Sequence, residues 1–204
     1  MTDASTHWQK VWTDKSPDET SWFEHDPSTI ERVLHYCEDS GSVIDIGGGA
    51  STLIDGLLDA GVADLCVLDV AESALARSRR RLGSRAASVN WVCADVNSWV
   101  PPRSWTVWHD RAAFHFQIDD DAVDRYLSVM AQGVAPDGVA IITTFASDGP
   151  TQCSGLPVRR WSAEEFARHM PPTFELLESS RSTHLTPWGA EQSMVTMVCR
   201  RHSA

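Results

Sequence analysis

Two glycines and three aspartates stand where a parallel sheet could hold a ligand at the ends of its strands. Asp45 closes a short apolar run and is followed by Gly47 and Gly49 before a helix-like pattern. Glycines at these positions suit a sharp turn whose backbone approaches a ligand closely, with the N–H groups of the next helix facing it. Asp69 and Asp95 follow the next two apolar runs. Asp69 lies about 20 residues beyond the glycines, where a carboxylate can accept hydrogen bonds from both ribose hydroxyls.

The ligand that this set favours is a cationic nucleoside without phosphate. The third glycine of a dinucleotide fingerprint would fall at position 52, which is Thr52, so a pyrophosphate site of the NAD type is left open but is not favoured. Carboxylates at three successive strand ends attract positive charge instead. The alternatives are structural: an ordinary strand-to-helix turn at Gly47 and Gly49, and a capping role for Asp69 at the helix that follows it.

A second group of reactive side chains follows a later apolar run. It comprises His109, Asp110, Arg111 and, four positions further on, His115. A neutral imidazole titrates close to neutral pH, so either histidine, like Asp110, could accept a proton from a nucleophile. For both histidines, burial with satisfied ring nitrogens is an equally good interpretation.

Tryptophan is unusually common in this chain, with 9 Trp against 6 Phe and 2 Tyr. Trp8, Trp12 and Trp22 lie in a polar N-terminal segment that has too few apolar residues to fold alone. Trp8 and Trp12 share one face of a helix, because residues four apart are neighbours there. They either pack on the sheet or close over a bound ligand. In the second case, Trp12→Ala would weaken ligand binding and leave the stability of the unliganded protein nearly unchanged.

The apolar periodicity predicts strands and helices in regular alternation around these residues. The first helix is expected to open with Asp26 as N-cap and Pro27 in its first turn, and to close at Gly41. Arg81 belongs to a row of arginines at helical spacing that is typical of a solvated helix face. Strands are expected at residues 42–46, 65–69, 89–93, 105–110, 139–145, 174–177 and 194–199, and further helices at residues 53–58, 72–82, 120–132 and 163–170.

Regular alternation of this kind is typical of a doubly wound α/β domain. We therefore expect an N-terminal aromatic arm at residues 1–26 and one Rossmann-like domain at residues 27–204. Its sheet should hold seven strands, mostly parallel, with an antiparallel C-terminal strand. A long loop at residues 149–157, which contains glycine and proline, follows the fifth strand. It lies on the edge where ligands bind in such sheets.

The composition excludes several classes of partner. Lys+Arg 17 against Asp+Glu 28 gives a net charge of −11, which repels a nucleic-acid backbone. The 5 cysteines are widely spaced and include no Cys-x-x-Cys pair, so neither a disulfide framework nor a metal site is predicted. No apolar stretch is long enough to cross a bilayer, and the N-terminus lacks the order of a signal peptide. We expect a cytoplasmic protein that binds neither membranes nor nucleic acid.

Four motifs resemble those of class I methyltransferases that use S-adenosylmethionine. They are Val43 to Gly49, Leu68 to Val70, Cys93 to Val96 and Ala135 to Gly138, within residues 27–145. The resemblance implies that the glycines line the methionine part of the cofactor, that Asp69 binds its ribose and that Asp95 borders its adenine. Ser51 stands where many members have a third glycine. The residues that the resemblance assigns to the cofactor are Asp45, Gly47, Gly49, Ser51, Asp69, Val70, Asp95 and Val96.

Two further segments are similar to the thiopurine methyltransferase and thiol/halide methyltransferase group. They are residues 8–23 in the arm and residues 108–113 after the fourth predicted strand. The similarity implies that Trp8 and Trp12 close over the cofactor, and we expect Trp22 of the same arm to join them in a lid. It also implies that Asp110 and Arg111 face the methyl acceptor. His109 and His115 are not part of this pattern.

The first functional hypothesis is methyl transfer to a small molecule, with a thiol or another soft nucleophile preferred. A sulfonium methyl is already activated, so the enzyme needs a nucleophile held in line at about 3 to 3.5 Å, shielded from water, and no metal. Aromatic faces would stabilise the sulfonium. The alternatives are a protein side-chain acceptor such as lysine on the same fold and, less favoured, an NAD-dependent oxidoreductase. The oligomeric state stays open.

Overall fold

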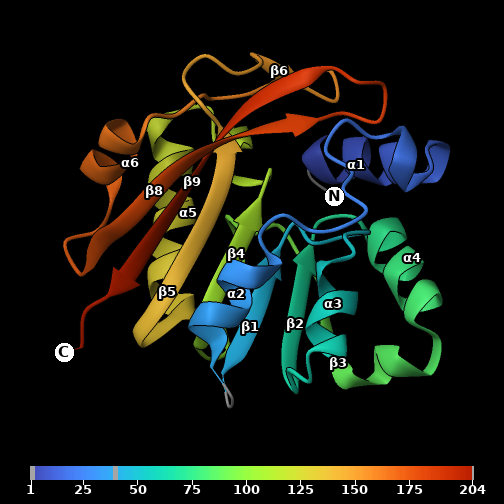
Figure 1. Cartoon of the computed structure of the whole chain (residues 1–204), viewed down its shortest axis with the longest axis horizontal. Helices are drawn as coiled ribbons and strands as arrows, with labels where there is room; N and C mark the ends of the chain where they lie inside the picture. The colour runs from blue at the N-terminus through green and yellow to red at the C-terminus, as the bar shows by residue number, and fades with distance from the viewer. Residues whose placement is uncertain (1–2, 39–40, 204) are drawn as a thin grey trace.

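The computed structural model describes residues 3–38 and 41–203 and is built around a seven-stranded sheet (Figure 1). Its strands are β1 (Ser42–Ile46), β2 (Asp64–Asp69), β3 (Val89–Cys93), β4 (Trp105–Arg111), β5 (Val134–Phe145), β8 (Phe174–Leu185) and β9 (Glu191–Arg201). Their order is β3-β2-β1-β4-β5-β9-β8. Strands β1 to β5 pair in parallel, and β9 runs antiparallel to both of its neighbours. This arrangement confirms the predicted fold class.

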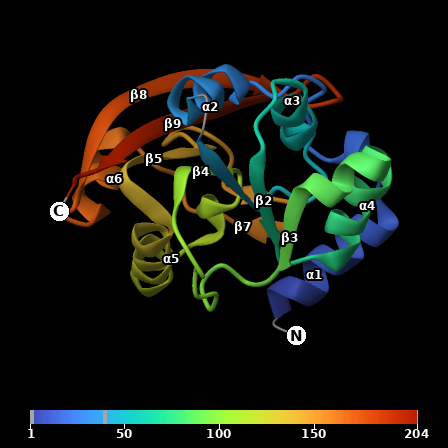
Figure 2. The ribbon, with the colours of Figure 1, turned by 90° about the horizontal axis from the view of Figure 1, so that it is seen from below.

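Helices cover both faces of the sheet (Figure 2). Neighbouring residues of β1 point to opposite sides. Ile44 belongs to the same buried cluster as Tyr126 of α5 (Asp120–Gly133), whereas Val43 packs with Leu57 of α3 (Leu53–Asp59). No helix of the described residues is long and apolar enough to cross a membrane. The other elements are α1 (Asp3–Asp14), α2 (Ile30–Cys37), α4 (Glu72–Leu82), α6 (Ala163–His169), the 3-10 helices η1 (Pro17–Glu19), η2 (Gly83–Ser88) and η3 (Phe114–Phe116), and the hairpin strands β6 (Gln152–Cys153) and β7 (Leu156–Pro157).

The first helix of the sheet domain begins later than predicted. α2 starts at Ile30, so the expected start at Asp26 is wrong. The Glu24 carboxylate accepts hydrogen bonds from the backbone N–H of Ser28 at 3.1 Å and from its hydroxyl at 2.9 Å. These bonds hold residues 24–28 in a turn that competes with the helix. Residues 39 and 40, which fall in the predicted helix, lie outside the described residues, as do residues 1, 2 and 204.

The two C-terminal strands are longer than predicted. β8 pairs with β9 from Phe174 opposite Arg201 to Leu185 opposite Glu191, whereas the apolar pattern indicated only residues 174–177 and 194–199. β8 lies at the edge of the sheet and most of its side chains are exposed. A strand of this kind shows little apolar alternation, because neither of its faces is fully covered. The hairpin therefore reaches further over the carboxyl edge of the sheet than the sequence indicates (Figure 1).

A buried chain of hydrogen bonds ties β4 to α5. The indole Nε1 of Trp108 donates to the Tyr126 hydroxyl at 3.0 Å, and that hydroxyl donates to Asp110 Oδ2 at 2.6 Å. The other oxygen of Asp110 accepts from the backbone N–H groups of Ala113 and Phe114, at 3.0 and 3.1 Å. Burial raises the pKa of Asp110 to about 6, against the effect of these bonds. The carboxylate thereby fixes the turn that follows β4.

Tyr126→Phe should lower the free energy of unfolding by about 1 to 3 kcal/mol, because Trp108 and Asp110 each lose a buried partner. Urea denaturation followed by tryptophan fluorescence measures this loss. Tyr36→Phe is the matched control, since Tyr36 is only partly buried and its hydroxyl makes no hydrogen bond among the described residues. Equal effects of the two substitutions would contradict a structural role for the buried chain.

Candidate functional site

A cavity of about 200 Å³, here called the main cavity, lies at the carboxyl ends of β1 to β4. Residues of α1 and of the segment after it close one side. The cavity brings together most of the predicted ligand-binding residues, namely Trp8, Trp12, Trp22, Gly47, Asp69, Val70, Asp95 and Val96. Among the four predicted catalytic residues, Arg111 lines it.

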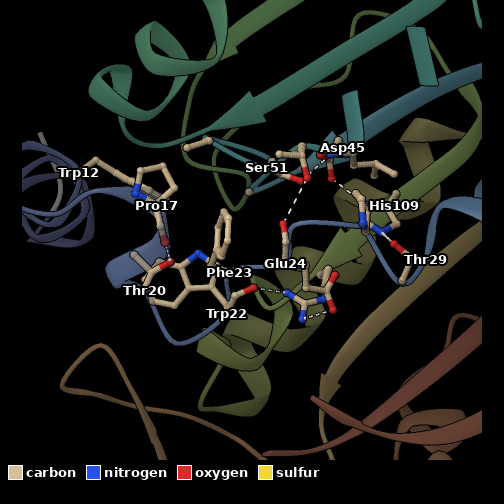
Figure 3. Close-up of a pocket in the computed structure, with 17 residues that line it drawn as sticks. Trp12, Pro17, Thr20, Trp22, Phe23, Glu24, Thr29, Asp45, Ser51 and His109 are labelled. Atoms are coloured by element: carbon tan, nitrogen blue, oxygen red, sulfur yellow. Dashed lines mark hydrogen bonds and ion pairs between the residues drawn. The ribbon is translucent and has the colours of Figure 1, made fainter. Parts of the chain in front are cut away.

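A second cavity of about 60 Å³, here called the arm cavity, lies between the glycine loop and residues 17–29 (Figure 3). Its wall includes the predicted residues Asp45, Ser51 and His109. Some residues line both cavities, and these are Trp12, Trp22, Gly47 and Arg111. The predicted site residues are thus divided between two cavities that share a wall.

The two motif glycines are required by close approach of other groups. Gly47 has φ +66°, and a Cβ there would lie 2.7 Å from the Cβ of Ala113. Gly49 has φ +28°, and a Cβ there would lie 2.6 Å from Asp69 Oδ2. Both backbone conformations favour glycine over residues with a side chain. Gly49 lines neither cavity, and its missing side chain makes room for the Asp69 carboxylate.

Asp69 ends β2 and forms part of the main cavity wall. Its Oδ1 accepts a hydrogen bond from the backbone N–H of Ala71 at 2.8 Å. Ala71 is itself the N-cap residue of α4, so Asp69 contacts the residue before the helix but does not cap the helix as the alternative proposed. Burial raises the pKa of Asp69 to about 7, and the charge of Asp45 adds to this effect. Asp95 follows β3, and its Oδ1 accepts from the backbone N–H of Asn97 at 3.0 Å.

Asp45 and His109 form a buried pair, each with 2% of its surface exposed. His109 Nδ1 lies 2.7 Å from Asp45 Oδ1, and His109 Nε2 lies 2.9 Å from the Thr29 hydroxyl (Figure 3). Both ring nitrogens are therefore engaged, as expected of a satisfied buried histidine. A Cβ at Gly48 would lie 2.3 Å from Asp45 Oδ2. The Asp45 carboxylate thus supports the glycine loop from behind and joins β1, β4 and the start of α2.

Arg111 lies at the end of β4, between the two cavities. Its guanidinium donates to the Trp22 carbonyl at 2.8 Å and to Glu24 at 2.7 Å, and lies 3.2 Å from His184 Nδ1. Burial opposes ionisation of Glu24, but the hydrogen bond with His184 and the charge of Arg111 lower its pKa to about 2. Arg111 Nε has no partner among the described residues. Arg111 therefore anchors the end of the arm and presents a charged group to both cavities.

His115 lies on η3 and is fully buried. Its ring stacks on Phe145 with centroids 4.6 Å apart and meets the Phe116 ring edge-on at 4.5 Å. Neither ring nitrogen has a hydrogen-bond partner among the described residues. Burial, together with the charge of Arg111, lowers the pKa of His115 to about 3, so the ring is neutral. Phe116 lines the main cavity, and His115 lies directly behind it.

The arm tryptophans pack edge-to-face at the main cavity. Trp8 contacts Trp22 and Phe116 with ring centroids 5.6 and 5.1 Å apart, and Trp12 contacts Trp22 at 5.9 Å. Trp12 is only 7% exposed and packs against alanines next to the glycine loop and at the start of α4. Its removal would leave a hole in the structure. The expectation that Trp12→Ala spares the stability of the unliganded protein does not fit this burial.

Several residues of the main cavity were not predicted. Asn97 Nδ2 donates to Gln117 Oε1 at 2.8 Å, and both side chains line the wall. They follow the ends of β3 and β4, so the position after a strand, which located Asp95, could have located these amides too. Cys153 reaches the wall from β6, and burial raises its pKa to about 11. Its approach depends on how the loop folds, which no local pattern indicates.

Arg81 was expected on a solvated helix face but braces the glycine loop. Its guanidinium donates to the carbonyl oxygens of Ala50 at 3.0 Å and Ser51 at 2.6 Å. It also forms an ion pair with Asp55 at 2.7 Å. The Ser51 hydroxyl accepts from the backbone N–H of Leu53 at 3.1 Å. Ser51 is therefore held at both its side chain and its carbonyl, at the start of α3.

The free energy of unfolding of Asp69→Asn, minus that of wild type, should be larger at pH 7.5 than at pH 4.5 when both proteins are unliganded. A carboxyl whose pKa is raised on folding contributes stability at low pH, and this contribution is lost as pH rises from the unfolded pKa of about 4 to the folded pKa of about 7. Asparagine has no such dependence. Urea denaturation at both pH values measures the difference, with the exposed Asp124→Asn as control. A difference that is the same at both pH values would contradict the raised pKa.

The sequence of the sheet's first half matches a family model. Residues 43–138 match a model described as a methyltransferase domain. The match begins in β1 and ends in β5, so it includes the glycine loop and the carboxylates Asp69 and Asp95. No curated protein matches the chain.

Solved structures with a similar fold cover nearly all of the chain. One, from work on the conversion of a disulfide into a thioacetal in echinomycin biosynthesis, has a TM-score of 0.78 at 17% identity and covers 97% of this chain and 93% of that one. The Burkholderia thailandensis 1,6-didemethyltoxoflavin-N1-methyltransferase has a TM-score of 0.71 at 21% identity, covering 98% and 84%.

The N-methyltransferase NodS from Bradyrhizobium japonicum, in complex with S-adenosylhomocysteine, has a TM-score of 0.73 at 13% identity, with 98% of this chain and 99% of that chain covered. At such low identities these likenesses establish the fold, and the family match adds the chemistry. Residues 43–138 match the methyltransferase domain model, and this match indicates an enzyme that transfers a methyl group from S-adenosylmethionine.

Proposed function

We propose that this enzyme methylates a small-molecule nucleophile in the main cavity, with a thiol or another soft nucleophile preferred. The observation that carries this proposal is the composition of the cavity wall. The wall combines Gly47, Asp69 and Asp95, which lie at strand ends, with aromatic rings, Cys153 and Arg111, and we assign the first set to one end of the cavity and the second set to the other. The first end suits the cofactor, and the second leaves a separate, mainly apolar place for an acceptor.

The residues of the first end fit the cofactor. Asp69 interacts with the backbone N–H groups of Ala71, Gly49 and Val70. A carboxylate has about four lone-pair sites, so Asp69 can also accept hydrogen bonds from a ribose hydroxyl. Asp95 and Val96 line the same wall one strand further, where the adenine would lie. At Gly47 a side chain would collide with Ala113, so the bare backbone can approach the methionine part. The bound cofactor supplies a methyl group already activated on a sulfonium, which leaves positioning and exclusion of water to the protein.

The second end favours a neutral or soft acceptor over an ammonium group. Trp8, Trp22 and Phe116 provide its apolar surface. The charge of Arg111 is balanced by Glu24, which lines only the arm cavity. The carboxylates that line the main cavity are Asp69 and Asp95, and both lie at the cofactor end. A lysine side chain would therefore meet no carboxylate of its own, which makes a protein acceptor the second candidate.

The predicted catalytic residues take different roles in this proposal. Arg111 faces the acceptor with an Nε that has no partner among the described residues. Asp110 holds the turn after β4, and His109 holds the Asp45 carboxylate, so both act through the backbone that they position. The place of Arg111 supports the similarity to the thiopurine and thiol/halide methyltransferase group. No residue is assigned as a general base.

Residues 1–26 serve as a lid on the domain of residues 27–204 in this proposal. α1 lies against α4, where the Gln9 side chain accepts a hydrogen bond from the backbone N–H of Ser73 at 3.3 Å. The end of the arm is clamped by Arg111. Trp8, next to the first anchor, and Trp12, between the two anchors, line the main cavity. The arm thus covers the cofactor and keeps water from the reacting atoms.

Two findings support the choice of acceptor and setting. The Burkholderia enzyme named above was crystallised with 1,6-didemethyltoxoflavin and S-adenosylhomocysteine, and its name describes methylation at a nitrogen. A soft nitrogen therefore stands beside the thiol as an acceptor atom. The described cysteines, Cys37, Cys66, Cys93, Cys153 and Cys199, are all free thiols, which supports a reducing, cytoplasmic setting.

Trp8→Ala should raise the Kd for S-adenosylmethionine by about 3- to 10-fold through loss of aromatic contact with the sulfonium, with little loss of stability. Trp12→Ala should raise this Kd as well, but should also lower the free energy of unfolding by about 3 to 5 kcal/mol, because Trp12 is buried. Calorimetric titration and urea denaturation measure the two effects. An unchanged Kd for Trp8→Ala would show that the arm does not cover the cofactor.

The acceptor class is tested by release of S-adenosylhomocysteine with thiophenol, benzylamine or benzoate. We expect thiophenol to react fastest and benzoate slowest, because the acceptor end is apolar and lacks a free carboxylate for an ammonium ion. A preference for benzoate would contradict the soft nucleophile. Release with none of the three, together with transfer of labelled methyl into acid-insoluble protein, would favour the protein acceptor.

A further inference from the structure

His115 is a buried polar group that the protein leaves without a partner. The side chain has 0% of its surface exposed, and both Nδ1 and Nε2 lack a hydrogen-bond partner among the described residues. Burying a polar group without a partner costs stability, and native proteins rarely accept this twice on one side chain. A phenylalanine would fill the same place between aromatic rings at no such cost. Packing alone therefore does not explain why position 115 is a histidine.

The position of the ring connects it to the acceptor end of the main cavity. His115 stacks on Phe145 and touches the Phe116 ring, with centroids 4.6 and 4.5 Å away. Phe145 belongs to the same buried cluster as Cys153, and both Cys153 and Phe116 line the cavity. The imidazole is thus one ring behind the wall. Phe116 is only partly buried, and its ring lies between His115 and the cavity, so contact between His115 and a ligand requires rotation of the Phe116 side chain.

The His115 imidazole is neutral, and a neutral ring can lie near the positively charged sulfonium without repulsion. Burial, with the charge of Arg111, lowers the pKa of His115 to about 3, so the ring stays neutral at physiological pH. A neutral imidazole offers one N–H donor and one lone-pair acceptor, and it does not repel a cationic methyl donor. With a pKa this low the ring is a weak base. Its use is to form hydrogen bonds rather than to remove a proton.

We propose that His115 hydrogen-bonds the methyl acceptor when Phe116 turns aside, and thereby selects acceptors that carry a polar group next to the nucleophilic atom. This inference rests on the proposed function, because it assumes that the acceptor lies at the aromatic end of the main cavity. It adds a substrate class to that function: a soft nucleophile with an adjacent hydroxyl, carbonyl or ring nitrogen. An apolar thiol would leave the imidazole unpaired, and its affinity would be lower.

The test compares thiophenol with 2-mercaptophenol, which adds one hydroxyl next to the sulfur. Wild type should use 2-mercaptophenol with a kcat/KM at least tenfold higher than that for thiophenol. His115→Phe keeps the aromatic stacking and should reduce this ratio to within twofold of that for the uncatalysed reaction with S-adenosylmethionine. The Kd for the cofactor should change less than twofold, and the melting temperature should stay equal or rise.

Thr144→Val is the matched control, because Thr144, like His115, carries a buried polar atom without a partner among the described residues and lines neither cavity, but it lacks the ring contact with Phe116 that His115 makes. It should leave the preference between the two thiols as in wild type. If His115→Phe also leaves the preference unchanged, His115 is a packed histidine, or one paired with a buried water only, and the inference is overturned. His115→Gln provides a second variant if the phenylalanine protein does not fold.

Calorimetry separates this inference from the proposed function. Binding of 2-mercaptophenol to the complex with S-adenosylhomocysteine should weaken at least tenfold in His115→Phe, whether or not the thiol is turned over. Binding without turnover in wild type would count against the thiol as acceptor and leave the role of His115 supported. Equal binding to wild type and to His115→Phe would overturn the role of His115.

Discussion

The site depends on three carboxylates that are buried at the ends of neighbouring parallel strands. Asp45, Asp69 and Asp110 are exposed by 2%, 6% and 0%. Parallel strands all end at one edge, so their last side chains gather there, and each buried carboxylate requires compensation. Asp45 is compensated by His109, Asp110 by Tyr126 and backbone N–H groups, and Asp69 by the N–H at the start of α4. Of these three, only Asp69 lines the main cavity, and this restricts which part of a ligand can be bound there.

The fold could be predicted, and the residues that we propose for the cofactor could be located, because their signals are local. A short apolar run followed by glycine or aspartate indicates the end of a buried strand. This pattern located Gly47, Asp69 and Asp95. The pairing of Asp45 with His109 could not be predicted in the same way. The two residues lie opposite each other in the register of β1 and β4. The pattern locates both strands but not which residues face each other, because register is set by packing of the whole sheet.

The later start of α2 and the acceptor end were missed for a related reason. The apolar periodicity of a segment shows which of its side chains are buried. It does not show which side chain outside the segment accepts hydrogen bonds from its backbone N–H groups. Glu24 holds Ser28 in a turn and is itself held by Arg111 from the end of β4. The arm cavity lies between residues 17–29 and the glycine loop, so its shape depends on contacts between segments far apart in the sequence. The aromatic arm could be recognised from its tryptophans, but not the division of site residues between two cavities.

Cys153 places a nucleophile of the protein's own in the main cavity, where the proposed function puts methyl transfer. Only the thiolate is strongly nucleophilic. With its pKa raised to about 11 by burial, roughly one Cys153 in ten thousand is ionised at pH 7. An acceptor thiol of ordinary acidity, near pKa 8.5, ionises several hundred times more readily at that pH, by roughly 2.5 pKa units. Burial of Cys153 therefore keeps its thiol protonated, which disfavours methylation of the enzyme by its own cofactor. A change in the loop that exposed this thiol would favour methylation of Cys153.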